Sequence, residues 1–84
     1  MKALKWAQAF SDSQEGIEHN PDHYMLYFSA ATSLYNMRDY VACRYYLKMC
    51  EKFTPDAFKG EMQPKIDQIK ESLIKAGAWK EKGK

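Results

Sequence analysis

The chain has 84 residues, 45% hydrophobic and 29% charged, which is typical of one small folded domain near the size at which a single core becomes marginal. Its formal net charge of +2 and its scattered lysines argue against a nucleic-acid-binding protein. The sequence contains no stretch long and apolar enough to span a bilayer and no apolar secretion-signal segment, so we expect a cytoplasmic protein without membrane contact.

The first segment, residues 1–19, has the apolar spacing of an amphipathic helix. One helical face contains Trp6, Ala9, Phe10, Ser13 and Ile17. We expect this helix to end near His19, because Pro21 follows and cannot continue the backbone hydrogen bonding of a helix.

Residues 24–53 contain neither Gly nor Pro, and their apolar residues recur at helical spacing, which predicts two helices joined by a short turn. The first is expected to open at Asn20-Pro21-Asp22, where Pro21 suits a first helical turn and Asn20 or Asp22 can cap it. It should run to about Asn36. Its packing face contains Tyr27, Ala30, Ala31 and Leu34.

The second helix of this pair is expected to begin at about Asp39. Its packing face contains Tyr40, Cys43, Leu47 and Cys50. Because the connection Met37-Arg38-Asp39 is short, we predict an antiparallel helical hairpin.

The C-terminal segment, residues 56–77, has a third amphipathic pattern. Its apolar stripe contains Phe58, Met62, Ile66, Ile69, Leu73 and Ala76. The stripe crosses Pro64 without losing phase, which predicts either one helix kinked there or a helix that starts there after a short turn. Gly77 is the expected C-cap, and residues 78–84 are expected to form a solvated tail.

Two similar tripeptides 34 residues apart indicate an internal repeat: Asn-Pro-Asp at 20–22 and Thr-Pro-Asp at 54–56. A helix-turn-helix unit of this length is the tetratricopeptide repeat (TPR), and residues 22–55 resemble one full copy. The resemblance is based on aromatic, small and closing-proline positions, namely Tyr27, Ala30, Ala31, Leu34, Tyr40, Cys43, Leu47, Cys50 and Pro55.

In the same register, residues 1–19 resemble the second helix of an incomplete TPR, and residues 56–77 are predicted to form a C-terminal capping helix. The fold that this resemblance implies is all-α, with about four helices forming antiparallel hairpins stacked as a short right-handed superhelix.

TPR domains are binding scaffolds, so the resemblance implies a protein–protein interaction module that binds a peptide or amphipathic helix of a partner. The family's groove is lined by the first helix of each repeat. By helical phase, the groove positions here are Met25, Phe28, Thr32, Tyr35 and Asn36. Their apolar and aromatic character suits a hydrophobic or amphipathic ligand.

Two alternative functions stay open at this point. Repeat arrays usually need about three units for stability, so we expect the chain to be either the C-terminal end of a longer array or a structural module that forms homo-oligomers. The candidate self-association face contains Leu4, Trp6 and Phe10. The second alternative is a secretion-type chaperone that shields an apolar segment of its client.

The sequence lacks a motif for catalysis, metal binding or cofactor binding. His19 and His23 are four residues apart, but Pro21 lies between them and they belong to no zinc-binding pattern. Cys43 and Cys50 lie two helical turns apart, roughly 10 Å, which is beyond the reach of a disulfide. We therefore expect no enzyme, no metal site and no cofactor, and we interpret both cysteines as small packing residues.

Overall fold

The computed structural model describes residues 2–79, with side chains from Lys5 onward, and within that range it contains four α-helices and no strand. The helices are α1 (Lys2–His19), α2 (Tyr24–Asn36), α3 (Tyr40–Phe53) and α4 (Asp56–Lys75). They form a flat body with principal extents of 36 × 33 × 19 Å. The predicted all-α fold is therefore confirmed.

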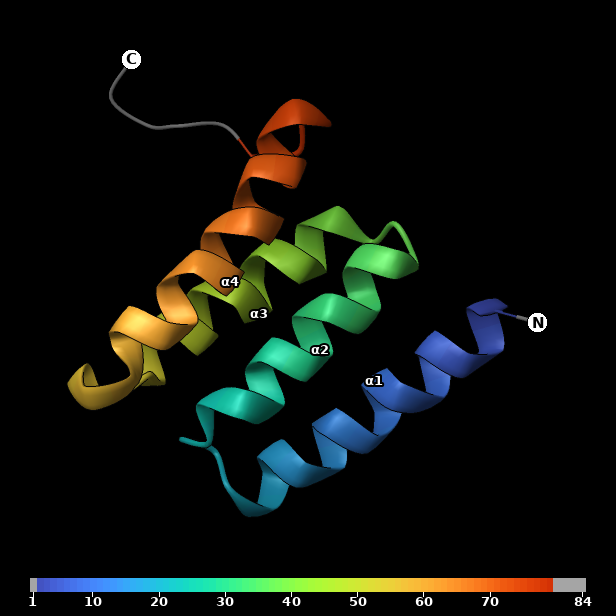
Figure 1. The fold of residues 1–84 in the computed structure, drawn as a ribbon. Helices are drawn as coiled ribbons and strands as arrows, with labels where there is room; N and C mark the ends of the chain where they lie inside the picture. Colours follow the sequence, from blue (N-terminus) through green and yellow to red (C-terminus); the bar gives the residue numbers. More distant parts are fainter. Residues whose placement is uncertain (1, 80–84) are drawn as a thin grey trace.

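Helix α2 occupies the centre of the arrangement and contacts each of the other three helices. In Figure 1, α2 lies between α1 and α3, and α4 crosses in front of α3. Helices α1 and α2 run in opposite directions, as do α2 and α3. A side chain on α2 can therefore reach α1, α3, α4 or solvent, depending on its helical phase.

The core lies where α2, α3 and α4 meet, and it is built from the packing faces that the sequence predicts. Its buried members are Tyr27, Ala31, Leu34, Cys43, Leu47, Cys50, Met62, Ile66 and Leu73. These residues recur three or four positions apart within each helix, so one stripe of each helix is removed from water. Burial of this apolar surface is the main force that holds the helices together.

Helix α1 packs on α2 through small residues. The Ser13 hydroxyl is buried, donates to the Ala9 carbonyl at 2.9 Å and lies 3.0 Å from the Ser29 hydroxyl. One turn further along, a Cβ atom on Gly16 would lie only 2.9 Å from both Cδ atoms of Leu26. The small side chains on α1 therefore allow close approach of the two helices.

The start of α2 differs from the prediction. The helix begins at Tyr24, and its N-cap residue is His23 rather than Asn20 or Asp22. No side chain accepts a capping hydrogen bond from the backbone N–H groups of the first turn. Instead, the His23 N–H donates to the Asn20 carbonyl at 3.1 Å and closes a turn across Pro21. Asn followed by Pro is a strong β-turn sequence, and here turn formation prevails over early helix initiation.

The turn between α2 and α3 contains an unusual backbone conformation. Arg38 has φ of 65°, in the left-handed region that favours glycine. Its N–H donates to the Tyr35 carbonyl at 3.1 Å, and the Asp39 N–H donates to the Leu34 carbonyl at 2.9 Å. These two bonds form a Schellman motif that ends α2, after which the Asp39 carboxylate accepts from the Ala42 N–H at 3.5 Å and caps α3.

Helix α4 runs without interruption through Pro64, so the prediction of one helix across this residue is the one observed. Proline at this position removes the hydrogen bond to the carbonyl of Gly60. Both residues lie on the exposed side of α4, where water can satisfy that carbonyl. The apolar stripe stays in phase, and Met62, Ile66 and Leu73 are buried.

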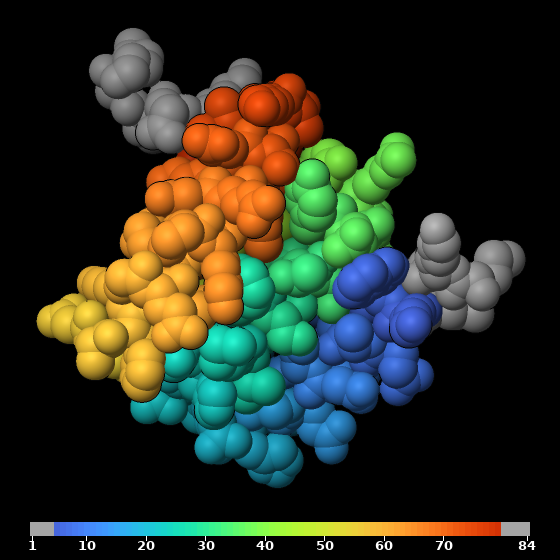
Figure 2. All heavy atoms as spheres, viewed as in Figure 1, coloured from blue at the N-terminus to red at the C-terminus, as the bar shows by residue number. Residues whose placement is uncertain are grey.

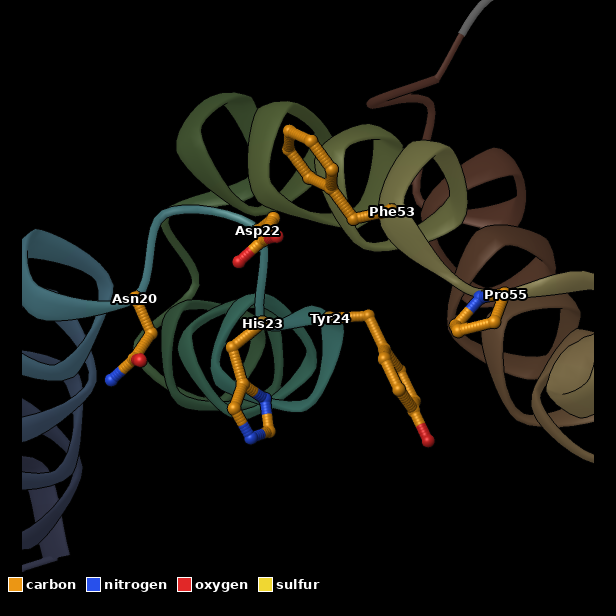
Figure 3. A pocket seen from close by; sticks show the side chains of 6 residues that line it. All are labelled: Asn20, Asp22, His23, Tyr24, Phe53 and Pro55. Atoms are coloured by element: carbon orange, nitrogen blue, oxygen red, sulfur yellow. The ribbon is translucent and has the colours of Figure 1, made fainter.

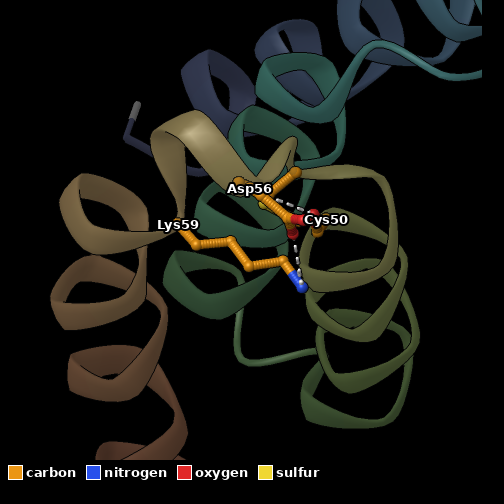
Figure 4. Close-up of polar contacts among 4 residues, drawn as sticks. Cys50, Asp56 and Lys59 are labelled. Atoms are coloured by element: carbon orange, nitrogen blue, oxygen red, sulfur yellow. Dashed lines mark hydrogen bonds and ion pairs between the residues drawn. The ribbon is translucent and has the colours of Figure 1, made fainter.

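Helices α3 and α4 are joined by a short turn that is stabilised by local polar contacts (Figure 4). The Thr54 hydroxyl donates to the Cys50 carbonyl at 2.6 Å, which satisfies one of the last acceptors of α3. On the other side of the turn, Lys59 pairs with Asp56 at 3.6 Å in the first turn of α4. Both side chains of that pair are exposed, so it adds little to stability.

Helix α4 ends just before Gly77, although the C-cap residue is Ala76 and Gly77 is the residue that follows it. Gly77 has φ of 78°, its N–H donates to the Ile74 carbonyl at 3.0 Å, and the Ala78 N–H donates to the Leu73 carbonyl at 2.9 Å. This Schellman motif turns the chain so that Ala78 and Trp79 are half-buried against the core. The prediction of a solvated tail is wrong for these two residues, and residues 80–84 lie outside the described part.

Candidate functional site

The five predicted groove residues, here called the α2 face, lie at successive turns of α2: Met25, Phe28, Thr32, Tyr35 and Asn36. They differ in how much of each side chain a partner can reach. Met25 is 42% exposed and Asn36 is also exposed, whereas Phe28 and Tyr35 are half-buried and pack against the core. The two large half-buried side chains therefore contribute to folding as well as to the surface.

The polar members of the α2 face are already hydrogen-bonded within the helix. The Thr32 hydroxyl donates to the Phe28 carbonyl at 2.9 Å, and the Asn36 amide donates to the Thr32 carbonyl at 2.8 Å. A partner that covers Thr32 therefore leaves its hydroxyl proton bonded. The Asn36 amide has a second N–H and a carbonyl oxygen, so a partner that covers it must offer polar groups.

An aromatic ladder extends the α2 face at its N-terminal end. The rings of His23 and Tyr24 stack with centroids 6.2 Å apart, and those of Tyr24 and Phe58 stack with centroids 6.0 Å apart at an interplanar angle of 23°. Phe58 belongs to the first turn of α4 and is 45% exposed. The ladder therefore connects the start of α2 with the start of α4, which lie side by side in Figure 2.

An open pocket of about 270 Å³ lies beside this ladder (Figure 3). Its lining residues come from the α1–α2 turn and the α3–α4 turn: Asn20, Asp22, His23, Tyr24, Phe53 and Pro55. The volume is slightly below the range of roughly 300–1,000 Å³ typical of small-molecule sites, so it fits a single large side chain. The lining combines aromatic rings with the Asp22 carboxylate, so the recess offers both apolar and polar contacts.

This pocket is not among the predicted sites, although the sequence contains a signal that points to it. The tripeptides at 20–22 and 54–56 occupy equivalent positions in the 34-residue register. Equivalent turns of stacked repeats lie at the same end of the stack, so residues of both turns are expected to be neighbours. Tyr24 and Phe53 flank these turns, and both line the pocket.

The candidate self-association face is described only in part. The side chain of Leu4 lies outside the described residues, and Trp6 is half-buried. Phe10 is also half-buried and packs against the core, with its ring edge-to-face on Tyr46 of α3 at a centroid distance of 5.6 Å. Phe10 therefore contributes to packing within one chain.

Both cysteines are packing residues, as predicted. Cys43 and Cys50 are free thiols with 0% exposure, and burial raises the pKa of each to about 11. The Cys43 thiol donates to the Ala31 carbonyl of α2 at 3.2 Å. Protonated, inaccessible thiols are poor nucleophiles, so this pair does not form a reactive site.

Among the residues that the structure describes, no three His, Cys, Asp or Glu side chains are grouped so that they can hold a metal ion. Within the same residues, every helix is too short or too polar to cross a membrane. Comparison of the chain with protein-family models, with curated protein sequences and with solved structures gives no match in any of the three.

Proposed function

We propose that the chain is a TPR-like protein–protein interaction module that binds a peptide or amphipathic helix of a partner. The observation that supports this proposal is the exposed apolar surface where α2 and α4 begin. Met25 is 42% exposed and Phe58 is 45% exposed, and Tyr24 stacks on Phe58 beside the pocket. We call Tyr24, Met25, Phe58 and the pocket the first-turn surface.

The chemistry of this surface favours an apolar anchor from the partner. Met25 adapts its shape to different side chains, and the rings of Tyr24 and Phe58 offer flat apolar area at low entropic cost. Burial of one large side chain of the ligand would contribute roughly 1.5–3 kcal/mol. The α2 face then offers a path along which the rest of an extended or helical segment can lie.

The direct test begins with peptides of about 16 residues, selected for binding from a random library. Their affinity is then measured for the wild type and for the Met25→Asp/Phe58→Asp variant. We expect this variant to bind at least about tenfold more weakly, because two carboxylates replace the apolar side chains that would contact the peptide. Failure to select any peptide would contradict the proposal.

A matched control adds the same two charges elsewhere. Val41 is 76% exposed and Ile74 is 42% exposed, and neither belongs to the first-turn surface or the α2 face. The Val41→Asp/Ile74→Asp variant should bind the selected peptides as the wild type does. Equal weakening in both double variants would show that net charge, rather than the first-turn surface, governs binding.

Homo-oligomerisation through the same surface is the second proposal, and sedimentation distinguishes the two. A wild-type protein that is monomeric and binds the selected peptides supports the scaffold function. A wild-type dimer that the Met25→Asp/Phe58→Asp variant dissociates, and that does not bind such peptides, would support the structural function instead. A secretion-type chaperone would require a client segment that competes with the selected peptides.

A further inference from the structure

Three cations surround one tryptophan at the end of the described chain. The Trp79 ring centroid lies 5.1 Å from the Lys70 Nζ atom, 5.7 Å from the Lys48 Nζ atom and 6.0 Å from the Arg44 Cζ atom. Lys48 and Arg44 come from α3, and Lys70 comes from α4. We call these four residues the Trp79 cluster.

The position of the cluster follows from the fold. Arg44 and Lys48 are one helical turn apart on α3, so their side chains lie on the same side of that helix. The Schellman motif at Gly77 turns the chain back, and Trp79 then packs against the core between the two helices. This packing holds the Trp79 ring in place, and the ring makes cation–π contacts with side chains of both α3 and α4.

The positive charge of the cluster lacks a carboxylate counterpart among the described side chains. There, the one ion pair within 4.0 Å joins Lys59 to Asp56, in another part of α4. Glu51, on α3, instead accepts from the Gln63 amide at 3.2 Å, and Asp67 accepts from the same amide at 2.9 Å.

We propose that the Trp79 cluster binds an acidic peptide segment of a partner. Carboxylates would relieve the repulsion among the three cations, and the Arg44 guanidinium can hold one of them with two parallel hydrogen bonds. The exposed part of the Trp79 ring provides an apolar platform for the peptide between its charged groups. Charge complementarity identifies the occupant, because no carboxylate among the described side chains lies within 4.0 Å of these three cations.

This site is independent of the proposed scaffold function. It shares no residue with the first-turn surface or with the α2 face, and its ligand is acidic rather than apolar. An acidic peptide suits it better than a nucleic acid, because the three cations form one compact group rather than a long basic track. Each site can therefore be lost by substitution without loss of the other.

The test follows the fluorescence of Trp79 in the full chain, with Trp6→Phe as the background so that one tryptophan reports. Hexaglutamate is titrated at low salt, and hexaserine of equal length serves as the control peptide. We expect saturable binding of hexaglutamate alone, with an affinity that falls as NaCl rises from about 20 to about 200 mM. Absence of a saturable change with hexaglutamate would overturn the proposal.

Two triple variants with equal net charge show whether the cluster itself is responsible. Arg44→Gln/Lys48→Gln/Lys70→Gln should weaken hexaglutamate binding about tenfold. In contrast, Lys5→Gln/Lys59→Gln/Lys65→Gln removes three exposed charges elsewhere and should change it less than about twofold.

Two further outcomes would overturn the proposal. Equal weakening by both triple variants would overturn the proposal in favour of non-specific attraction. Tighter binding of a DNA oligonucleotide than of hexaglutamate at the same salt concentration would overturn the assignment to an acidic peptide. Circular dichroism spectra are compared first, and we expect no loss of helix, because neutralising clustered like charges removes repulsion.

Discussion

Phe10 on α1 and Tyr46 on α3 meet edge to face, with ring centroids 5.6 Å apart and an interplanar angle of 88°. Within residues 2–79, no Cα atom of α1 comes within 8 Å of a Cα atom of α3. The two rings therefore bridge helices whose backbones do not touch. Tyr46 also lies 6.2 Å from the Tyr27 ring, so the bridge continues to α2.

This bridge is tested by a double-mutant cycle with Phe10→Leu, Tyr46→Leu and the double variant. We expect a coupling energy of about 0.5–1.5 kcal/mol, the contribution of an aromatic pair beyond its buried area. The measurement is the free energy of unfolding from denaturant titration. Strict additivity of the two single substitutions would show that α1 is held by α2 alone.

Arg38→Gly should stabilise the protein. Arg38 has φ of 65°, a conformation that costs a side-chain-bearing residue roughly 1–2 kcal/mol, whereas glycine adopts it freely. Part of this gain is lost because glycine increases the entropy of the unfolded chain, so we expect a net gain of about 0.5–1 kcal/mol. In a thermal melt this gain corresponds to a rise in Tm of about 4 °C. An unchanged or lower Tm would contradict the left-handed conformation of this turn.

Gly77→Ala should have the opposite effect. A Cβ atom at Gly77 would meet no heavy atom within 4 Å, so the cost comes from the backbone alone, whose φ is 78°. We expect a loss of about 1 kcal/mol in the free energy of unfolding. Gly60→Ala is the control, because it also lies in open space but within α4, where alanine should add about 0.5–1 kcal/mol.

The sequence was sufficient to predict the helices and their packing faces, because burial repeats every three or four residues. Ala30, Ala31 and Leu34 are buried as their spacing predicts, and so are Cys43 and Leu47. These positions depend on local periodicity, which the order of residues records directly.

Features that depend on contacts between distant turns were not predictable in the same way. The pocket joins Tyr24 to Phe53, and the Trp79 cluster joins α3 to the chain beyond α4. Pairings of this kind depend on how the hairpins stack, which periodicity within one helix does not encode. The start of α2 was predicted too early, because the sequence Asn20-Pro21 is compatible with both a β-turn and the start of a helix.

The buried thiols should make stability depend on pH above 9. In the unfolded chain each thiol has its ordinary pKa of 9.0, whereas burial raises the pKa of Cys43 and Cys50 to about 11 in the folded protein. Between these values the unfolded state loses protons that the folded state keeps. The stabilisation is therefore complete below pH 9 and decreases as the pH rises toward 11, by up to about 1.4 kcal/mol per pH unit for each thiol.

The measurement is the free energy of unfolding as a function of pH, for the wild type and for Cys43→Ala/Cys50→Ala. The double variant removes both thiols but retains the lysines and tyrosines that also titrate in this range. We expect its stability to fall less steeply above pH 9 than that of the wild type. Equal slopes, or rapid modification of the native protein by a thiol reagent at neutral pH, would show that the thiols are not buried.

Tyr27→Phe should loosen the turn that forms one side of the pocket. The Tyr27 hydroxyl donates to the Pro21 carbonyl at 2.5 Å, while its ring stacks on Phe53 with centroids 5.4 Å apart. Phenylalanine keeps the stacking and removes only the hydrogen bond, so the free energy of unfolding should fall by about 0.5–1.5 kcal/mol. The control is Tyr45→Phe, because Tyr45 is 58% exposed and the loss of its hydroxyl should change stability by less than about 0.5 kcal/mol.

Selected peptides that occupy the pocket should dissociate faster from Tyr27→Phe than from wild type, because residues 20–22 are held less firmly. Unchanged dissociation together with reduced stability would mean that the hydrogen bond supports the fold while the pocket takes no part in binding.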